Sequence, residues 1–203
     1  METDERKGHW DGIYASKADK EVSWFEAAPE TSLMLIAKTG VPLAAAIIDI
    51  GTGISKLPDA LVAAGYTDIT LLDVSQAALA VSRARLGDRV SYIAADITAW
   101  TPPRPYDVWH DRAVLHFLTE ERDRAAYRHA LLAATRAGSH AIFATFAPSG
   151  PDKCSGLPVR RYGESELGVF LGGEFRIVES FERDHVTPWN AVQRFFVARA
   201  LRG

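Results

Sequence analysis

The sequence predicts an α/β fold in which a doubly wound, mostly parallel sheet carries helices on both faces. Three observations lead to this prediction. Short apolar runs alternate with longer amphipathic stretches, glycines follow several of those stretches, and three apolar runs end at or beside an aspartate, namely Asp49, Asp73 and Asp96. Strands that alternate with helices in this way form βαβ units, and the strands of such units pair in parallel.

The first half of the chain is expected to hold three strands with helices around them. The predicted elements are a helix over Pro29–Lys38, a strand over Ala46–Ile50, a helix over Ser55–Ala64, a strand over Asp68–Leu72, a helix over Ser75–Arg85 and a strand over Val90–Ala94. Gly40 and Gly65 follow the first two helices, where glycine commonly ends a helix. Ser75 belongs to the residue types that cap a helix N-terminus.

The second half continues the alternation and ends in two strands. The predicted elements are a strand over Tyr106–His110, a helix over Glu120–Thr135, a strand over His140–Phe146, a short helix over Glu164–Phe170, and strands over Phe175–Phe181 and Val192–Arg199. The last two have a short connection, which favours antiparallel pairing. The pattern predicts one domain over residues 1–203 with a Rossmann-like seven-stranded sheet, mostly parallel with an antiparallel C-terminal strand.

Composition narrows the classes of partner. The chain has 203 residues, of which 47% are hydrophobic, so it is long enough to bury a sizeable core. A net charge of -3 leaves no basic footprint for nucleic acid, and the apolar runs are too short to span a membrane. The single cysteine, Cys154, excludes a disulfide framework and a cysteine-rich zinc site, and no metal is predicted. A cytoplasmic monomer or homodimer is expected.

The first strand runs into a glycine-rich turn that is typical of a cofactor cradle. Asp49 lies near the end of the strand, and Gly51, Thr52 and Gly53 follow it. Such a turn lets the amides at the start of the next helix face a ligand. Lys56 stands where a dinucleotide fingerprint has its third glycine, and an acid before the turn repels phosphate but suits a cofactor with an ammonium and a sulfonium group. The alternative is a tight turn that binds nothing.

Two further strand ends supply groups that a nucleoside needs. Asp73, followed by Val74, is placed to accept the hydroxyls of a ribose. Asp96 is placed to accept the exocyclic amine of adenine while Ile97 covers the ring, although Asp96 could instead cap a turn. The carboxyl ends of parallel strands share one edge of the sheet, so one ligand would meet all three acids. The cofactor that fits these observations is S-adenosylmethionine, with S-adenosylhomocysteine as its product.

His110, Asp111 and Arg112 follow the fourth strand and are the candidate catalytic residues. A histidine beside an aspartate can remove a proton from a methyl acceptor. The alternative is that His110 only lines the cofactor pocket and that Asp111 and Arg112 form a structural pair. His116 is a weaker candidate for proton transfer, and Cys154 is expected to be an ordinary loop residue.

Two segments are expected to close over the sheet. An N-terminal cap over residues 1–28 carries Trp10 and Tyr14, one helical turn apart, which would shield the cofactor from water, and Trp24, which would contact the acceptor. A substrate-side loop over residues 147–163 offers Leu157, Arg160 and Arg161 to an acceptor. The aromatic residues could instead fasten a helix to the sheet, and both arginines could simply face solvent.

These motifs resemble those of the class I S-adenosylmethionine-dependent methyltransferases over residues 30–200. Asp49-x-Gly51-x-Gly53 is similar to the first motif of that family, and Asp73 and Asp96 stand where it has its ribose and adenine acids. Ser55 replaces a third glycine that many members carry. The resemblance implies that the cofactor is bound by Trp10, Tyr14, Asp49, Gly51, Thr52, Gly53, Asp73, Val74, Asp96, Ile97 and His110.

A narrower likeness concerns the acceptor. The stretches Trp109–Leu115, Gly156–Val159 and Phe181–Trp189 resemble those of the thiopurine methyltransferase family, which implies a soft nucleophile such as sulfur on a small heterocycle. The Asp111-Arg112 region also resembles small protein-lysine methyltransferases. The leading hypothesis is methyl transfer to a small-molecule thiol or other soft heteroatom by in-line displacement. The alternatives are protein-lysine N-methylation, NAD-dependent oxidoreduction and a catalytically silent cofactor-binding module.

Overall fold

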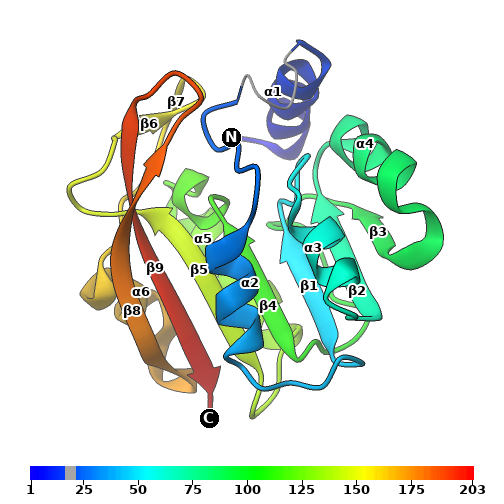
Figure 1. Ribbon diagram of the computed structural model, residues 1–203. Coiled ribbons are helices and arrows are strands. Elements are labelled where there is room, and N and C mark those ends of the chain that lie inside the picture. Colours follow the sequence, from blue (N-terminus) through cyan, green and yellow to red (C-terminus); the bar gives the residue numbers. More distant parts are fainter. Residues whose placement is uncertain (17–21) are drawn as a thin grey trace.

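The computed structural model describes residues 1–16 and 22–203 of the chain. Within this described part, the main sheet has seven strands in the order β3-β2-β1-β4-β5-β9-β8 (Figure 1). Strands β1 to β5 are parallel, β9 runs antiparallel to β5, and β8 runs antiparallel to β9. The strands are β1 (Ala46–Ile50), β2 (Asp68–Asp73), β3 (Ser91–Ala94), β4 (Val108–Arg112), β5 (His140–Phe146), β8 (Phe175–Val186) and β9 (Val192–Arg202). The predicted fold class is confirmed.

Helices cover both faces of the sheet. In Figure 1, α2 and α3 lie in front of the sheet and α5 and α6 lie behind it, while α1 lies at the end of the sheet where the parallel strands finish. The helices are α1 (Thr3–Ser16), α2 (Glu30–Ala37), α3 (Leu57–Ala63), α4 (Gln76–Leu86), α5 (Glu121–Ala133) and α6 (Glu164–Leu171). Short 3-10 turns follow at η2 (Gly87–Arg89), η3 (Leu115–Phe117) and η4 (Gly172–Glu174).

The alternation of side chains along the strands divides the core in two. Ile47 and Val108 pack on the side of α2, α3 and α4, whereas Ile48 and Trp109 pack on the side of α5 and α6. Successive side chains of a strand point to opposite faces, and both faces of this sheet are covered. The central strands are therefore buried on both sides, which explains why they appear in the sequence as continuous apolar runs.

Several boundaries differ from the prediction. Helix α3 begins at Leu57 rather than Ser55, with a proline in its first turn, where the missing amide proton does no harm. The substrate-side loop over 147–163 contains a small hairpin of β6 (Lys153–Cys154) and β7 (Leu157–Pro158). Strands β8 and β9 are longer than predicted. Of the N-terminal cap, the helix α1 is described, and residues 17–21 lie outside the described residues.

Strand β4 begins two residues later than predicted and runs to Arg112, and this shift decides where its polar residues point. His110 shares the face of Val108, toward α2, whereas Asp111 shares the face of Trp109, toward α5. The Asp111 carboxylate accepts hydrogen bonds from the amides of Val114 at 2.8 Å and Leu115 at 3.0 Å. Asp111 therefore holds the turn after β4 in place.

Tyr127 of α5 extends this buried network. Its hydroxyl donates to Asp111 and accepts a hydrogen bond from the indole of Trp109 at 2.9 Å. Burial raises the pKa of Asp111 to about 6, although the bond from Tyr127 and the amide bonds oppose this rise. The network ties α5 to the end of β4.

We predict that Tyr127→Phe lowers the free energy of unfolding by about 2 kcal/mol, because the buried Asp111 carboxylate loses one of its three donors and the buried Trp109 indole N–H loses its acceptor. Urea denaturation followed by fluorescence measures this change. Tyr92→Phe is the control, since the Tyr92 hydroxyl bonds to the Gly87 carbonyl at an exposed edge. Equal stabilities for the two variants would contradict the role of the network.

Candidate functional site

A cavity opens at the carboxyl ends of the parallel strands, between the sheet and α1. It encloses about 1040 Å³ of empty space, including solvent at its mouth. Strands β1 and β4 are neighbours here, although the chain forms β2 and β3 on the other side of β1 in between. Ligands of open α/β sheets bind at such a switch point. The predicted residues that line the cavity are Trp10, Tyr14, Trp24, Asp49, Gly51, Thr52, Asp73, Val74, Asp96, Ile97, His110 and Arg112.

Both glycines of the turn after β1 are required by its conformation. Gly51 and Gly53 have φ angles of +62° and +52°, in the left-handed region. A Cβ on Gly51 would lie 2.0 Å from the Val114 side chain, and one on Gly53 would lie 2.5 Å from the Tyr14 hydroxyl. The turn therefore has room only for backbone, which leaves the floor of the cavity open to a ligand.

Asp49, His110 and Ser32 form a buried chain of hydrogen bonds beside this turn. Asp49 of β1 and His110 of β4 are direct partners in the strand register. His110 Nδ1 lies 2.7 Å from the Asp49 carboxylate, and Nε2 lies 2.9 Å from the Ser32 hydroxyl of α2. The carboxylate can only accept, so Nδ1 carries a proton, and in the neutral ring Nε2 accepts from the serine. The arrangement holds the imidazole in one tautomer and leaves Nε2 as a proton acceptor.

The second oxygen of Asp49 has no hydrogen-bond partner among the described residues, although it is buried. A buried carboxylate oxygen without a donor is costly. A cationic group in the cavity would satisfy it, which matches the ammonium predicted from the sequence.

Asp73 ends β2 and is also buried. One of its oxygens accepts from the amide of Gly53 at 2.7 Å and the other from the amide of Ser75 at 2.8 Å. Burial raises the pKa of Asp73 to about 6, although these two amide bonds act in the opposite direction. Each carboxylate oxygen has a further lone pair, so both can still accept a hydroxyl from a ligand.

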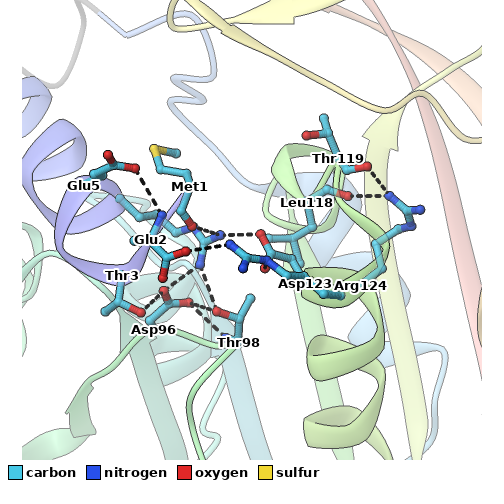
Figure 2. A network of polar contacts seen from close by, with 12 residues as sticks. Met1, Glu2, Thr3, Glu5, Asp96, Thr98, Leu118, Thr119, Asp123 and Arg124 are labelled. Atoms are coloured by element: carbon cyan, nitrogen blue, oxygen red, sulfur yellow. Dashed lines mark hydrogen bonds and ion pairs between the residues drawn. The ribbon is translucent and has the colours of Figure 1, made fainter.

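The Asp96 carboxylate is hydrogen-bonded by residues of α1 and of its own turn (Figure 2). Its carboxylate accepts from Arg6 at 2.6 Å, from Thr3 at 2.9 Å, and from the hydroxyl and amide of Thr98 at 2.8 and 2.9 Å. Burial raises the pKa of Asp96, but the bonds from Thr98 and Thr3 and the charge of Arg6 outweigh it, and the pKa is lowered. These four bonds use the lone pairs that the predicted bond to an adenine amine would need.

Arg6 links that carboxylate to a second one. Its other amino group donates to Asp123 of α5 at 2.8 Å and to the Met1 carbonyl at 3.1 Å. Arg6 is thus a buried cation that joins α1 to the turn after β3 and to α5. The neighbours of Arg6 in the sequence are mostly charged and exposed, so the hydrophobic pattern gave no sign that Arg6 is buried.

The aromatic residues of the N-terminal cap form one wall of the cavity. The Trp10 ring lies 5.0 Å from Phe117 and 5.8 Å from Trp24 between centroids, and 6.2 Å from Tyr14. These residues both line the cavity and fasten α1 to the rest of the chain, so the two interpretations weighed from the sequence describe the same contacts.

Other predicted residues lie elsewhere. Five predicted residues do not line the cavity, namely Gly53, Asp111, Leu157, Arg160 and Arg161. The Gly53 amide donates to Asp73, and Asp111 faces α5. Arg160 packs over Tyr162 and Arg161 bonds to the Gly150 carbonyl, both on the hairpin side. His116 is buried against Phe117 and Phe146, where burial, together with the charge of Arg112, lowers its pKa to about 3.

Besides Arg6, several residues that line the cavity were not predicted as site residues, and three of them have side chains that bear on the chemistry. Ser32 reaches His110 from α2, Glu26 lies beside Arg112, and Cys154 of β6 is buried at the cavity wall. Each meets the site through a contact between segments far apart in the sequence. Only Cys154 carried a signal, as the single cysteine of the chain.

We predict that Arg6→Gln loosens α1, because two buried carboxylates lose their cation. The free energy of local opening should fall by about 3 kcal/mol, so amide hydrogen exchange over residues 3–16 should accelerate roughly 100-fold. Exchange measured by mass spectrometry gives this rate. Arg136→Gln, which removes an exposed pair with Asp107 outside this network, should leave exchange unchanged. Unchanged exchange in Arg6→Gln would show that Arg6 does not hold the helix.

Residues 47–138 match a protein-family profile described as a methyltransferase domain. No curated protein matches the chain. A solved structure reported for the conversion of a disulfide bond into a thioacetal group during echinomycin biosynthesis is 20% identical, with a TM-score of 0.75 over 97% of this chain and 92% of that chain.

Two further solved structures share the fold. The 1,6-didemethyltoxoflavin N1-methyltransferase of Burkholderia thailandensis, solved with its acceptor and S-adenosylhomocysteine, is 21% identical, with a TM-score of 0.71 over 98% of this chain and 86% of that one. An S-adenosylmethionine-dependent methyltransferase of Anabaena variabilis is 12% identical, with a TM-score of 0.73 over 99% and 95%. Residues 47–138 are therefore similar to a methyltransferase domain, and the chain has the fold of the S-adenosylmethionine-dependent methyltransferases, as the sequence predicts.

Proposed function

We propose that this chain transfers the methyl group of S-adenosylmethionine to a soft heteroatom, such as a thiol sulfur, on a small-molecule acceptor. The observation that carries this proposal is the buried Asp49–His110–Ser32 chain at the switch point between β1 and β4. All three residues line the cavity, and in this proposal the carboxylate binds a cation and the imidazole accepts a proton. The methyltransferase domain and the shared fold support the reaction class.

The residues of the cavity fit the cofactor. The unpartnered oxygen of Asp49 suits the ammonium of its methionine part, and Gly51 leaves room for close approach. Asp73 suits the ribose hydroxyls, and Ile97 is placed to cover the adenine. Asp96, with its lone pairs in use, would act through Arg6 to hold α1 over the cavity. The solved neighbours with bound S-adenosylhomocysteine or S-adenosylmethionine support this assignment.

Bound S-adenosylmethionine would supply an electrophilic methyl group, which a nucleophile attacks in line while S-adenosylhomocysteine leaves. The task of the protein is then to align the nucleophile and to remove its proton where it carries one. In this proposal the Ser32 hydroxyl takes this proton and passes its own to His110 Nε2, and Asp49 stabilises the imidazolium that results. Trp10, Tyr14 and Trp24 keep water away from the reacting groups.

Two considerations bear on the acceptor. The likeness to thiopurine methyltransferases and the small acceptors named for solved neighbours favour a small molecule. The aromatic wall of Trp10, Tyr14 and Trp24 is an observation in favour of a lysine side chain, because aromatic faces attract ammonium groups. Transfer of labelled methyl into a proteome would support the second function, and its absence beside turnover of small thiols would support the first.

Calorimetric titration of the full chain with S-adenosylhomocysteine, beside NAD under the same conditions, tests the cofactor assignment. Micromolar binding of S-adenosylhomocysteine alone is expected. Binding of NAD alone, or of neither, would refute the proposal and return the chain to the oxidoreductase or silent-module alternatives.

We predict that Asp73→Asn weakens binding of S-adenosylhomocysteine by about 1 to 3 kcal/mol, since the ribose hydroxyls lose an ionised acceptor. The pKa of about 6 for Asp73 adds a pH dependence. Ligand hydroxyls favour the ionised carboxylate, so wild-type affinity should fall as the pH drops below about 6, and Asp73→Asn should not show this fall.

Titrations between pH 5 and pH 8 would measure both effects. Asp68→Asn is the matched control, because Asp68 begins the same strand and pairs with Arg104 away from the cavity. Affinity that falls equally with pH in the wild type and in Asp73→Asn would remove Asp73 from the site.

We predict that His110→Gln lowers the single-turnover rate with a thiol acceptor by about 100-fold at neutral pH. The loss should shrink above about pH 9, where an ordinary thiol has already ionised. A screen that begins with 2-mercaptoethanol would supply the acceptor. His129→Gln on the exposed face of α5 is the control. A loss that is constant from pH 7 to pH 10 would show that His110 does not take the proton.

A further inference from the structure

A second, smaller cavity opens beside the first, and the two share Glu26, Ser32, His110 and Arg112. It lies between β4, β5, α2 and the β8–β9 hairpin and encloses about 360 Å³ of empty space, including open solvent. Leu35, Ile142, Phe195 and Val197 make most of its wall apolar. His110, which belongs to the proposed proton path, therefore borders both cavities.

The polar part of this cavity surrounds a single carboxylate oxygen. Glu26 Oε1 lies 3.3 Å from Arg112 Nη2, 3.8 Å from His185 Nδ1 and 4.0 Å from Arg183 Nη2. Hydrogen bonds between charged groups are normally about 2.7 to 2.9 Å long, so Glu26 sits among these groups without a close bond to any of them. Arg112 Nη2 is buried and makes no hydrogen bond within the described part of the chain.

The charges around this oxygen are unequal. Arg112 and Arg183 are both cations, and Glu26 is the one anion among the residues of the second cavity. His185 Nε2 lies 2.6 Å from the Ser23 carbonyl and must donate to it, so in a neutral ring Nδ1 presents a lone pair to Glu26. Burial lowers the pKa of His185, which favours that neutral form. The charge of Asp49 also acts on Arg112, but Asp49 does not line the second cavity, and its unpartnered oxygen is the one proposed to meet the ammonium of the cofactor.

We infer that the second cavity binds the anionic group of the methyl acceptor, so that the acceptor is a small, largely apolar acid whose carboxylate or other oxyanion is held by Arg112 and Arg183. Glu26 occupies the place of that anion when the site is empty. The apolar wall receives the body of the acceptor, and the shared wall at His110 meets its nucleophilic atom. This inference rests on the proposed function and names the substrate class of the same site.

Binding of benzoate to the full chain saturated with S-adenosylhomocysteine tests the inference by calorimetry. Benzamide and benzylamine have the same ring and carry a neutral and a cationic group. Benzoate should bind at least tenfold more tightly than either. Benzamide that binds as well as benzoate would overturn the inference, and so would a failure of benzoate to bind. Tighter binding of benzylamine would show instead that Glu26 holds a cationic acceptor.

Variants connect this selectivity to the residues. Arg183→Gln should weaken benzoate binding at least tenfold, and its side chain is 36% exposed, so the variant should fold. Glu26→Gln should strengthen benzoate binding severalfold, because the competing carboxylate is gone, and a purely structural Glu26 would not produce this gain. Arg176→Gln is the matched control, since Arg176 lies on the same strand outside the cavity and is exposed.

The outcomes separate the two proposals. If S-adenosylhomocysteine fails to bind, the proposed function fails, whatever benzoate does. If S-adenosylhomocysteine binds with unchanged affinity in Arg183→Gln while benzoate affinity is also unchanged, the function stands and the anion site is refuted.

Discussion

The parallel pairing of β1 with β4 is the constraint on which the site depends. The chain forms β2 and β3 on one side of β1 and then returns to form β4 on the other, which opens a crevice at the carboxyl ends. In this pairing Asp49 lies opposite His110, and their side chains are hydrogen-bonded at 2.7 Å. A slip of one residue would turn His110 toward α5 and bring Asp111 to the cavity, because successive side chains face opposite sides.

Buried charge at this edge shows why the site fits a cationic cofactor. Asp49 keeps one oxygen without a donor among the described residues, and burial raises the pKa of Asp73 to about 6 even though two amides bond to it. A fold selected for stability alone would gain by replacing such groups with apolar ones. Asp111 is equally buried, but three donors satisfy it, and it serves the turn after β4. Asp49 and Asp73 line the cavity and can accept further hydrogen bonds, whereas Asp111 faces α5 and has three donors.

The sequence predicted those features that depend on local pattern. The bounds of β1 and β5 match, because each is an apolar run with clear ends. Strand β4 was placed two residues early, since Tyr106 is apolar and buried ahead of the strand while Asp111 and Arg112 are charged within it. Arg6 and Ser32 were missed because their partners lie 90 and 78 residues away. Periodicity shows which face a residue takes, but not which distant side chain it meets.

The two cavities meet at β4, where groups of opposite charge lie near each other. His110 stands between the carboxylate of Asp49 on one side and the guanidinium of Arg112, two residues further along the same face. The negative end suits a cationic methyl donor, and the positive end suits an anionic acceptor, so each ligand is disfavoured in the place of the other. Because His110 borders both cavities, a proton that leaves the proposed acceptor can reach Nε2 through the Ser32 hydroxyl, which lies 2.9 Å from it.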